Sequence, residues 1–499
     1  MKKGIFSILM MLLLIGANAN FLRYLQSSST NNYDYSSYTA EKTNENLSSA
    51  TVTCSTADQS VVYITNSGIT IEGSTLTKES GDSSNTENSE FYGVNAAVLV
   101  QGGGLTMTGG TISTKAKGAN ALCATNNGKV TISGTKITST ASSSGRGLHA
   151  TYGGSISATN VEISSTGGSC ATLATDRGEG TVTCTKCKLS TGGKGSPLIY
   201  STGQITVSET TGTSSAAQAV VVEGKNTATI TGSSNLKCDG GGNRDSNADK
   251  CGIMLYQSMS GDADSGTSTF ICESSTVEIL STSSVYSSAP MFFITNTDAA
   301  INLEDCTFTY GSGVFLNAGG TSEWGSTGSN GGVVTLTLKN QNIEGNFVVD
   351  GYSGLTINME SSSITGTINS EKTAAKLNIT LDSDSKITLT GNSYYTSLTN
   401  AKTDGSNLVN GTYSWTKTEE KEISRASGNS GGQSGRPDGS SGERPDGSSG
   451  EKSDGTSGEK SDGTSDSSSD NNSSESNILK YSIILFMPIL LFMFILFLC

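Results

Sequence analysis

The chain has 499 residues, of which 33% are hydrophobic and only 15% are charged, and its net charge is −14. This acidic balance argues against binding to nucleic acid or to anionic lipid, although it is compatible with cation binding. The hydrophobic content is low for a globular core, but it suits a thin β-solenoid whose outer surface is rich in Thr and Ser.

The N-terminus has the pattern of an export signal. Two lysines precede an apolar run, and Ala17-Asn-Ala19 supplies the small residues of a cleavage site. We therefore predict a signal peptide over residues 1–19. Residues 20–60 are expected to form an N-terminal segment that caps the first coil, because an uncovered strand edge invites edge-to-edge association.

A glycine then returns at a nearly constant interval, each time ahead of the same apolar pattern. Gly103, Gly128, Gly154 and Gly180 are 25, 26 and 26 residues apart. Two apolar columns can be followed behind them through about twelve repeats, which is typical of a solenoid. The first column is Ile71, Met107, Ile132, Ala158, Cys184, Val207, Ile230, Cys272, Leu303, Leu338, Met359 and Leu381, and the second is Leu76, Ile112, Ile137, Ile163, Leu189, a gap, Leu236, Val277, Phe308, Ile343, Ile364 and Ile387.

The local pattern within each repeat is that of a strand. Segments such as Leu105-Thr-Met107 and Val130-Thr-Ile132 alternate apolar and polar residues, and helical periodicity is confined to the two terminal hydrophobic segments. We predict an all-β fold in which residues 61–395 form the coils and residues 396–420 cap the last one. Insertions after Leu76 and Ile230 should leave the stack as loops.

The C-terminal residues combine a polar stalk and an apolar end. Residues 421–476 contain an eight-residue Ser/Gly/Asp-rich repeat that cannot bury a core, so we expect a disordered stalk. Residues 477–499 end in an apolar run that is either a transmembrane helix or a signal for a glycolipid (GPI) anchor attached at Asn472. The lack of basic residues beyond this run favours the anchor. In both cases the solenoid would stand outside the cell, at the plasma membrane.

The cysteines and sequons fit an exported protein. Cys238 and Cys251 bracket one insertion, so a disulfide across its base is the first predicted pairing. Cys272 and Cys306 lie on consecutive coils and could bridge them, whereas Cys184 is expected to be a core thiol. Glycosylation sequons begin at Asn46, Asn378 and Asn410.

Two sets of residues are candidates for binding. Asp239, Asp245 and Asp249 crowd one insertion and could hold calcium, which prefers several oxygen ligands from a short loop. Trp324 lies in a Gly-rich insertion and is the predicted stacking face for a sugar. Four tyrosines could line a flank of the stack: Tyr256, Tyr286, Tyr310 and Tyr352.

Runs such as Gly104-Leu-Thr-Met-Thr-Gly-Gly-Thr-Ile-Ser make the repeat similar to one known superfamily. Residues 61–395 resemble the right-handed parallel β-helix, or pectate-lyase-like, superfamily, and within it the Gly/Thr-rich adhesin-like or carbohydrate-binding surface proteins. The resemblance implies a single right-handed parallel β-helix of about twelve coils. It also raises the prospect of polysaccharide lyase or hydrolase activity.

The motifs of those enzymes are largely missing. Polygalacturonase-like members use Asn-Thr-Asp, Asp-Asp, Gly-His-Gly and Arg-Ile-Lys, but only Asn296-Thr-Asp298 occurs here, and it is expected to be a turn. His149 is the one histidine and has no identifiable partner, and no cluster of acidic residues recurs on neighbouring coils. We therefore predict no enzymatic activity and no cofactor beyond the calcium considered above.

The favoured function is that of a cell-surface-anchored, non-enzymatic protein for adhesion or for binding glycans or other surface ligands, including those of a host cell. A structural surface-coat protein is the second hypothesis, and a polysaccharide lyase or hydrolase is the third. Nucleic acid is not an expected partner.

Overall fold

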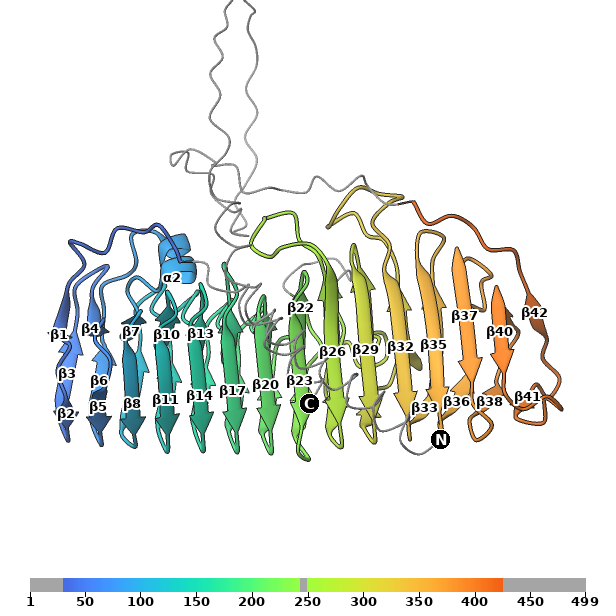
Figure 1. The fold of residues 1–499 in the computed structure, drawn as a ribbon, viewed down its shortest axis with the longest axis horizontal. Helices are drawn as coiled ribbons and strands as arrows, with labels where there is room; N and C mark the ends of the chain where they lie inside the picture. Colours follow the sequence, from blue (N-terminus) through green and yellow to red (C-terminus); the bar gives the residue numbers. More distant parts are fainter. Residues whose placement is uncertain (1–29, 243–248, 425–499) are drawn as a thin grey trace, which may run out of the picture. The chain divides into compact units, whose positions relative to one another are not determined.

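The computed structural model describes residues 30–242 and 249–424, which form one stack of coils (Figure 1). Each complete coil gives one strand to each of three long sheets, and every strand pairing is parallel. This is an all-β parallel β-helix, as the sequence predicted. We call the sheets A, B and C, with a shorter sheet D in line after sheet C.

The strands of sheet A have short spans. In order along the sheet they are β1 (Ala40–Thr43), β4 (Ser60–Ile64), β7 (Val98–Gln101), β10 (Leu122–Thr125), β13 (Leu148–Ala150), β16 (Leu173–Thr175), β19 (Ile199–Ser201), β22 (Val220–Glu223), β25 (Ile253–Tyr256), β28 (Phe292–Thr295), β31 (Val314–Ala318) and β34 (Asn346–Val349).

Sheet B is the longest sheet, with 14 strands. They are β2 (Leu47–Ser48), β5 (Ile69–Glu72), β8 (Gly104–Thr108), β11 (Lys129–Ser133), β14 (Ser155–Thr159), β17 (Thr181–Thr185), β20 (Gln204–Ser208), β23 (Thr227–Thr231), β26 (Thr267–Glu273), β29 (Asp298–Glu304), β32 (Val333–Lys339), β35 (Gly354–Glu360), β37 (Lys376–Leu381) and β40 (Ser397–Asn400).

The third side of the coil is divided between sheets C and D. Sheet C contains β3 (Thr51–Cys54), β6 (Thr75–Lys78), β9 (Thr111–Thr114), β12 (Lys136–Ser139), β15 (Glu162–Ser165), β18 (Lys188–Thr191), β21 (Thr211–Ser214), β24 (Asn235–Cys238), β27 (Thr276–Ile279) and β30 (Thr307–Thr309). Sheet D contains β33 (Asn342–Glu344), β36 (Ser363–Gly366), β38 (Lys386–Leu389) and β41 (Leu408–Val409), and β39 (Ser393–Tyr395) pairs with β42 (Trp415–Lys417).

The strand register confirms the first predicted column. Ile132 lies between Met107 and Ala158, and the same column continues without a slip to Leu381. The side chains of this column are buried in one continuous core cluster. Alternation along each strand turns the polar residues between them outward.

The stack is longer than the predicted twelve coils. Leu47 precedes Ile71 in the first column and Asn400 follows Leu381, so sheet B gains a strand at each end. Residues 40–54 are therefore the first coil and not a separate cap. Residues 397–417 likewise continue as short strands.

The repeating glycines are required by close backbone approach. A Cβ atom on Gly154 would lie 2.1 Å from the carbonyl oxygen of Ala124 on the preceding coil, and one on Gly128 would lie 2.3 Å from that of Val100. Neither glycine has a positive φ. The repeating glycines thus mark the positions where the backbones of two neighbouring coils are too close for a Cβ atom.

The outer face of sheet A is covered, although solvent would be expected there. Segments that leave the coil period fold back over it, among them residues 30–38, helix α2 (Thr86–Tyr92) and the loop that carries Trp324 (Figure 1). Asn85 caps the N-terminus of α2, where its side chain accepts from the Glu87 N–H, and Gly93 caps the C-terminus with φ 75°. Gly93 lies directly against Leu99 and Cys123 of sheet A.

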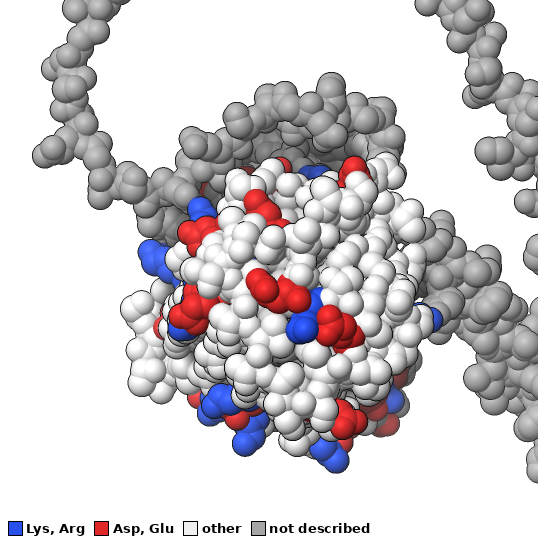
Figure 2. Space-filling model, turned by 90° about the vertical axis from the view of Figure 1, so that its left-hand side faces the viewer, with Lys and Arg blue, Asp and Glu red and all other residues white. Residues whose placement is uncertain are grey.

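The N-terminal end of the stack carries charges of both signs. Figure 2 looks at this end and shows acidic and basic side chains distributed over it. In the first coil Lys42 Nζ lies 3.1 Å from Glu45 Oε2. Charged residues on an open edge disfavour pairing with another chain, so the edge is protected in part by its own side chains.

The gap in the second column gives the first prediction. Gly212 lies between Leu189 and Leu236, and a Cβ there would approach Leu198 Cδ1 to 2.7 Å. Leu198 therefore fills the gap. We expect Gly212→Leu to lower the free energy of unfolding by about 1–3 kcal/mol through overpacking, measured by denaturant unfolding. Adding Leu198→Ala should restore part of the loss, and a more stable Gly212→Leu protein would show that the site is empty.

Candidate functional site

The structure contradicts the prediction that Trp324 is an exposed stacking face. Its side chain is only 7% exposed and packs with Val221, Met254 and Phe293 on the outer face of sheet A. The Trp324 and Tyr256 rings meet edge to face, with centroids 5.2 Å apart. No broad face of the indole remains for a sugar, because the loop has folded down onto the apolar sheet.

The calcium prediction cannot be placed as a site. Asp245 lies outside the described residues, and Asp239 and Asp249 flank the undescribed stretch 243–248. Within residues 30–242 and 249–424, no group of three or more His, Cys, Asp or Glu side chains is placed to hold a metal ion. The calcium site therefore stays a prediction.

The structure also corrects the disulfide prediction. Cys238 and Cys251 are both buried free thiols, because Cys238 joins the interior core while Cys251 joins the cluster outside sheet A. The predicted bridge between Cys272 and Cys306 is present. Cys184, expected to be a core thiol, is bonded to Cys187.

The sequons occupy different environments. Asn46 and Asn410 are exposed, whereas Asn378 is partly buried in β37 and accepts a hydrogen bond from Thr396 Oγ1 at 2.9 Å. The predicted anchor residue, Asn472, lies outside the described residues.

A buried polar cluster lies on the outer face of sheet A, and it was not predicted from the sequence. Arg146 Nη2 lies 3.2 Å from Asp176 Oδ2 and 3.6 Å from Glu90 Oε1, which comes from α2. All three side chains are at most 11% exposed. Burial raises the pKa of Asp176 to about 8, although the neighbouring Arg146 opposes the shift.

Further polar side chains extend this cluster along the next coils. Glu223 is 1% exposed, and its Oε2 accepts hydrogen bonds from the Tyr200 and Tyr256 hydroxyls. Arg177 donates to Asp262 Oδ1 at 3.0 and 3.1 Å, and its guanidinium lies 3.8 Å from the centroid of the Phe91 ring. The cluster therefore ties α2 and the loop around Asp262 to the sheet.

His149 occupies the same face but makes no polar contact. It is fully buried between Cys123 and Ala174 on the neighbouring strands. Among the described residues, neither ring nitrogen has a hydrogen-bond partner. Burial and the nearby Arg146 lower the His149 pKa, so the ring is neutral and packs like an apolar side chain.

Acidic side chains from separate coils and from a loop lie along this face, although in the described ranges no three of them are grouped to hold a metal ion. Asp176 directly follows β16 and Glu223 is the last residue of β22, with β19 between these strands in sheet A, and Asp262 lies in a loop. Their positions after sheet A strands were the available signal. Asp176 and Glu223 are 4% and 1% exposed, so a polymer cannot reach both without displacing the covering loops. Asn296 has φ 54° directly after β28, so Asn296 and Thr297 form the bend between the strands and Asp298 begins β29.

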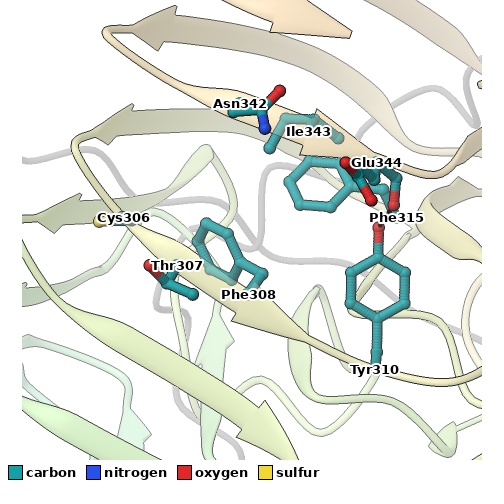
Figure 3. A pocket seen from close by; sticks show the side chains of 8 residues that line it. All are labelled: Cys306, Thr307, Phe308, Tyr310, Phe315, Asn342, Ile343 and Glu344. Carbon is teal, nitrogen blue, oxygen red and sulfur yellow. Dashed lines mark hydrogen bonds between the residues drawn. The ribbon is translucent and has the colours of Figure 1, made fainter. Parts of the chain in front are cut away.

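A second feature is open to solvent, at the break between sheets C and D. β30 and β33 belong to different sheets, although sheets A and B both continue past this level, sheet A with a register shift between Val314 and Leu316. A cavity of about 280 Å³ lies at the break (Figure 3). Its lining comprises Cys306, Thr307, Phe308, Tyr310, Phe315, Asn342, Ile343 and Glu344.

Side chains bridge both ends of this break. At one end, the Gln341 amide accepts from the Cys306 N–H at 2.9 Å and donates to the Cys306 carbonyl oxygen, which replaces a strand pairing. At the other end, the Tyr310 hydroxyl donates to the Glu344 carbonyl oxygen at 2.7 Å, and Figure 3 shows its ring standing across the gap. Between the bridges lie the two facing strand edges.

The floor and rim of the cavity differ in chemistry. Phe308 is partly exposed and packs edge to face on Phe315, with centroids 5.6 Å apart. Asn342 and Glu344 on β33 are exposed, and so is Thr307 on β30. The result is an aromatic floor with hydroxyl, amide and carboxylate groups around it. Among these residues, Tyr310 is the one that the sequence analysis had named as a possible binding residue on a flank of the stack.

The comparisons with known proteins concern the C-terminal part of the chain. Residues 351–498 match the model of the Merozoite Surface Antigen 2 (MSA-2) family. The matched residues include the last coils from β35 onward and leave out most of the β-helix. No curated protein and no solved structure matches the chain.

The similarity to a surface-antigen family supports a cell-surface protein. The resemblance to the pectate-lyase-like superfamily gains no such support, and the parallel β-helix itself is what the structure shows. In the described ranges no helix is both long enough and apolar enough to cross a bilayer. The apolar run near the C-terminus lies outside those ranges.

The buried cluster predicts a large effect at Arg146. At pH 9, above the Asp176 pKa, Arg146→Met should lower the free energy of unfolding by about 3–5 kcal/mol, because it leaves the Glu90 and Asp176 carboxylates buried without a cation. Denaturant unfolding measures the loss. Combining it with Glu90→Gln and Asp176→Asn should recover most of it. The partly exposed Arg177 is the control, with a loss of about 1 kcal/mol for Arg177→Met. Equal losses at the two arginines would contradict the cluster.

The raised Asp176 pKa predicts a pH dependence of stability. A carboxyl whose pKa is raised by folding makes its full contribution to the free energy of unfolding below its pKa in the unfolded chain, near 4. This contribution is lost as the pH rises through its folded-state pKa of about 8. Relative to Asp176→Asn, the wild-type protein should lose roughly 1–3 kcal/mol between pH 5 and pH 9. Thermal unfolding of both proteins across this range tests it, and parallel pH profiles would refute the assignment.

Proposed function

We propose that this chain is a non-enzymatic adhesin of the cell surface, which binds a glycan at the cavity between β30 and β33. The observation that carries the proposal is the break between sheets C and D, which opens an aromatic floor to solvent beside polar side chains. The similarity to a surface-antigen family supports the location.

The chemistry of the cavity suits a sugar. Aromatic rings pack against the apolar face of a pyranose, and the hydroxyl, amide and carboxylate groups of Thr307, Asn342 and Glu344 can exchange hydrogen bonds with its hydroxyls. The volume of about 280 Å³ is at the lower end of small-molecule sites, so it fits one sugar unit or a chain end. The proposal requires no cofactor.

The attachment to the cell is part of the same proposal. Residues 1–19 act as the signal peptide, and the C-terminal residues provide a GPI anchor at Asn472 or a membrane span. Release of the protein from cells by a GPI-cleaving phospholipase would identify the anchor. A structural coat protein has the same location but needs no open cavity, and a lyase or hydrolase needs carboxylates that substrate can reach. The buried positions of Asp176 and Glu223 disfavour the enzyme.

Rim substitutions test the proposal without disturbing the core. On an array of extracellular glycans, the wild-type ectodomain should bind a limited set of structures. Asn342→Ala and Glu344→Gln should each weaken that binding about tenfold, the effect of losing about 1.4 kcal/mol of hydrogen bonding.

The matched control is Glu360→Gln, because Glu360 is an exposed carboxylate at the end of β35 in sheet B. Its binding should equal that of the wild-type protein. Unchanged binding by both the Asn342→Ala and the Glu344→Gln proteins would show that the glycan binds outside this cavity. An array without any binding would favour the coat protein, and release of new reducing or unsaturated ends from a polysaccharide would overturn the non-enzymatic assignment.

A further inference from the structure

A lysine lies inside the stack near its N-terminal end. Lys78 is the last residue of β6 and is fully buried, and its ladder partner on the first coil is Cys54, the last residue of β3. Cys54 is also fully buried and is a free thiol. A buried lysine is rare because its charged form loses hydration, so its partners need to be identified.

The Lys78 amine has three partners. Its Nζ donates to the carbonyl oxygens of Thr56 and Gln59, the latter at 2.8 Å, in the turn that follows β3. It also lies 3.7 Å from Cys54 Sγ. The amine and the thiol therefore face each other from two neighbouring coils.

Lys78 departs from the pattern of its own column. The next five positions of that column hold small hydroxyl side chains, which fit the interior without a charge. These residues are Thr114, Ser139, Ser165, Thr191 and Ser214. The lysine therefore occurs only where a free thiol lies beside it.

We propose that Cys54 and Lys78 are joined by a covalent S–O–N bridge when the protein meets dioxygen outside the cell. The thiol loses its S–H bond, the neutral amine loses one N–H bond, and the O–O bond of dioxygen breaks. One oxygen atom becomes bonded to both sulfur and nitrogen, and the other leaves as water with the two hydrogens. Sulfur and nitrogen give up two electrons each, and dioxygen takes up four.

The environment favours this step. The reaction needs the neutral amine, and burial lowers the pKa of Lys78. The atoms already lie in contact, so closure requires a shift of about 1 Å. The product would tie β3 to β6 and fix the first coil, whose outer edge has no further strand in any of the three sheets among the described residues.

Peptide mapping of the air-exposed, folded protein tests the bridge. A digest without reductant should contain the Cys54 and Lys78 peptides joined, with a mass about 14 Da above their sum, because one oxygen is gained and two hydrogens are lost. Treatment with a thiol reductant should return both free peptides. In the unreduced, unfolded protein, Cys54 should resist alkylation.

The matched control is Cys238, a second fully buried free thiol, which has Ser214 and Ile279 as its ladder neighbours. Cys238→Ser should keep the joined peptide, whereas Cys54→Ser should abolish it. Full alkylation of Cys54 after saturating exposure to dioxygen would overturn the proposal. So would a Cys54 peptide joined to another cysteine. Both readings come from the wild-type protein, so they do not depend on the folding of a Lys78 variant.

Discussion

The close stacking of parallel strands is the constraint on which the rest of this structure depends. Each coil lies against the next at the hydrogen-bonding distance of a sheet, roughly 4.8 Å. Every interior side chain therefore meets its counterpart one coil away, and every tight crossing excludes a Cβ atom. The apolar column through Ile132 and the glycines at Gly128 and Gly154 are two consequences of this one spacing. Gly212 is a third, because Leu198 takes up the volume that the column leaves there.

The same stacking explains why the Arg146 cluster and the open cavity lie outside the interior of the coil. The strands have the same spacing on all three sides of the coil, which leaves little room for a cavity between coils. Sites that differ from the repeat are therefore made by the inserted segments. These segments fold back over the outer face of sheet A, where they bury Trp324 and enclose Arg146 with its acidic partners. Sheets C and D open for a different reason. The bridges made by Gln341 and Tyr310 hold β30 and β33 apart while sheets A and B continue. The inserted segments over sheet A thus enclose a buried cluster, whereas the break between sheets C and D is open to solvent.

The coil ends face a separate problem, because a stack has two open edges. Charges on the first coil reduce the risk of association with another chain. Inside the same end, Lys78 satisfies carbonyl groups that the turn after β3 directs into the stack. A covalent link from Lys78 to Cys54 would strengthen the coil that has the fewest neighbours. Such a link would keep the first coil folded on a protein that is displayed outside the cell, where chaperones do not refold it.

The strands of sheet B and of the third side of the coil, their register and two interior columns could be predicted from the sequence. Those features depend on residues that repeat at a fixed interval, and periodicity is visible in a single chain. The sequence did not determine the number of coils, because the end coils keep the shape of the repeat while losing its apolar residues, as Asn400 shows. It also misplaced Trp324 and missed the grouping of Glu90, Arg146 and Asp176. These residues come from insertions and from strand ends tens of residues apart. Which of them meet is known only from the folded chain, because their contacts follow from how loops fold across a sheet and not from any period in the sequence.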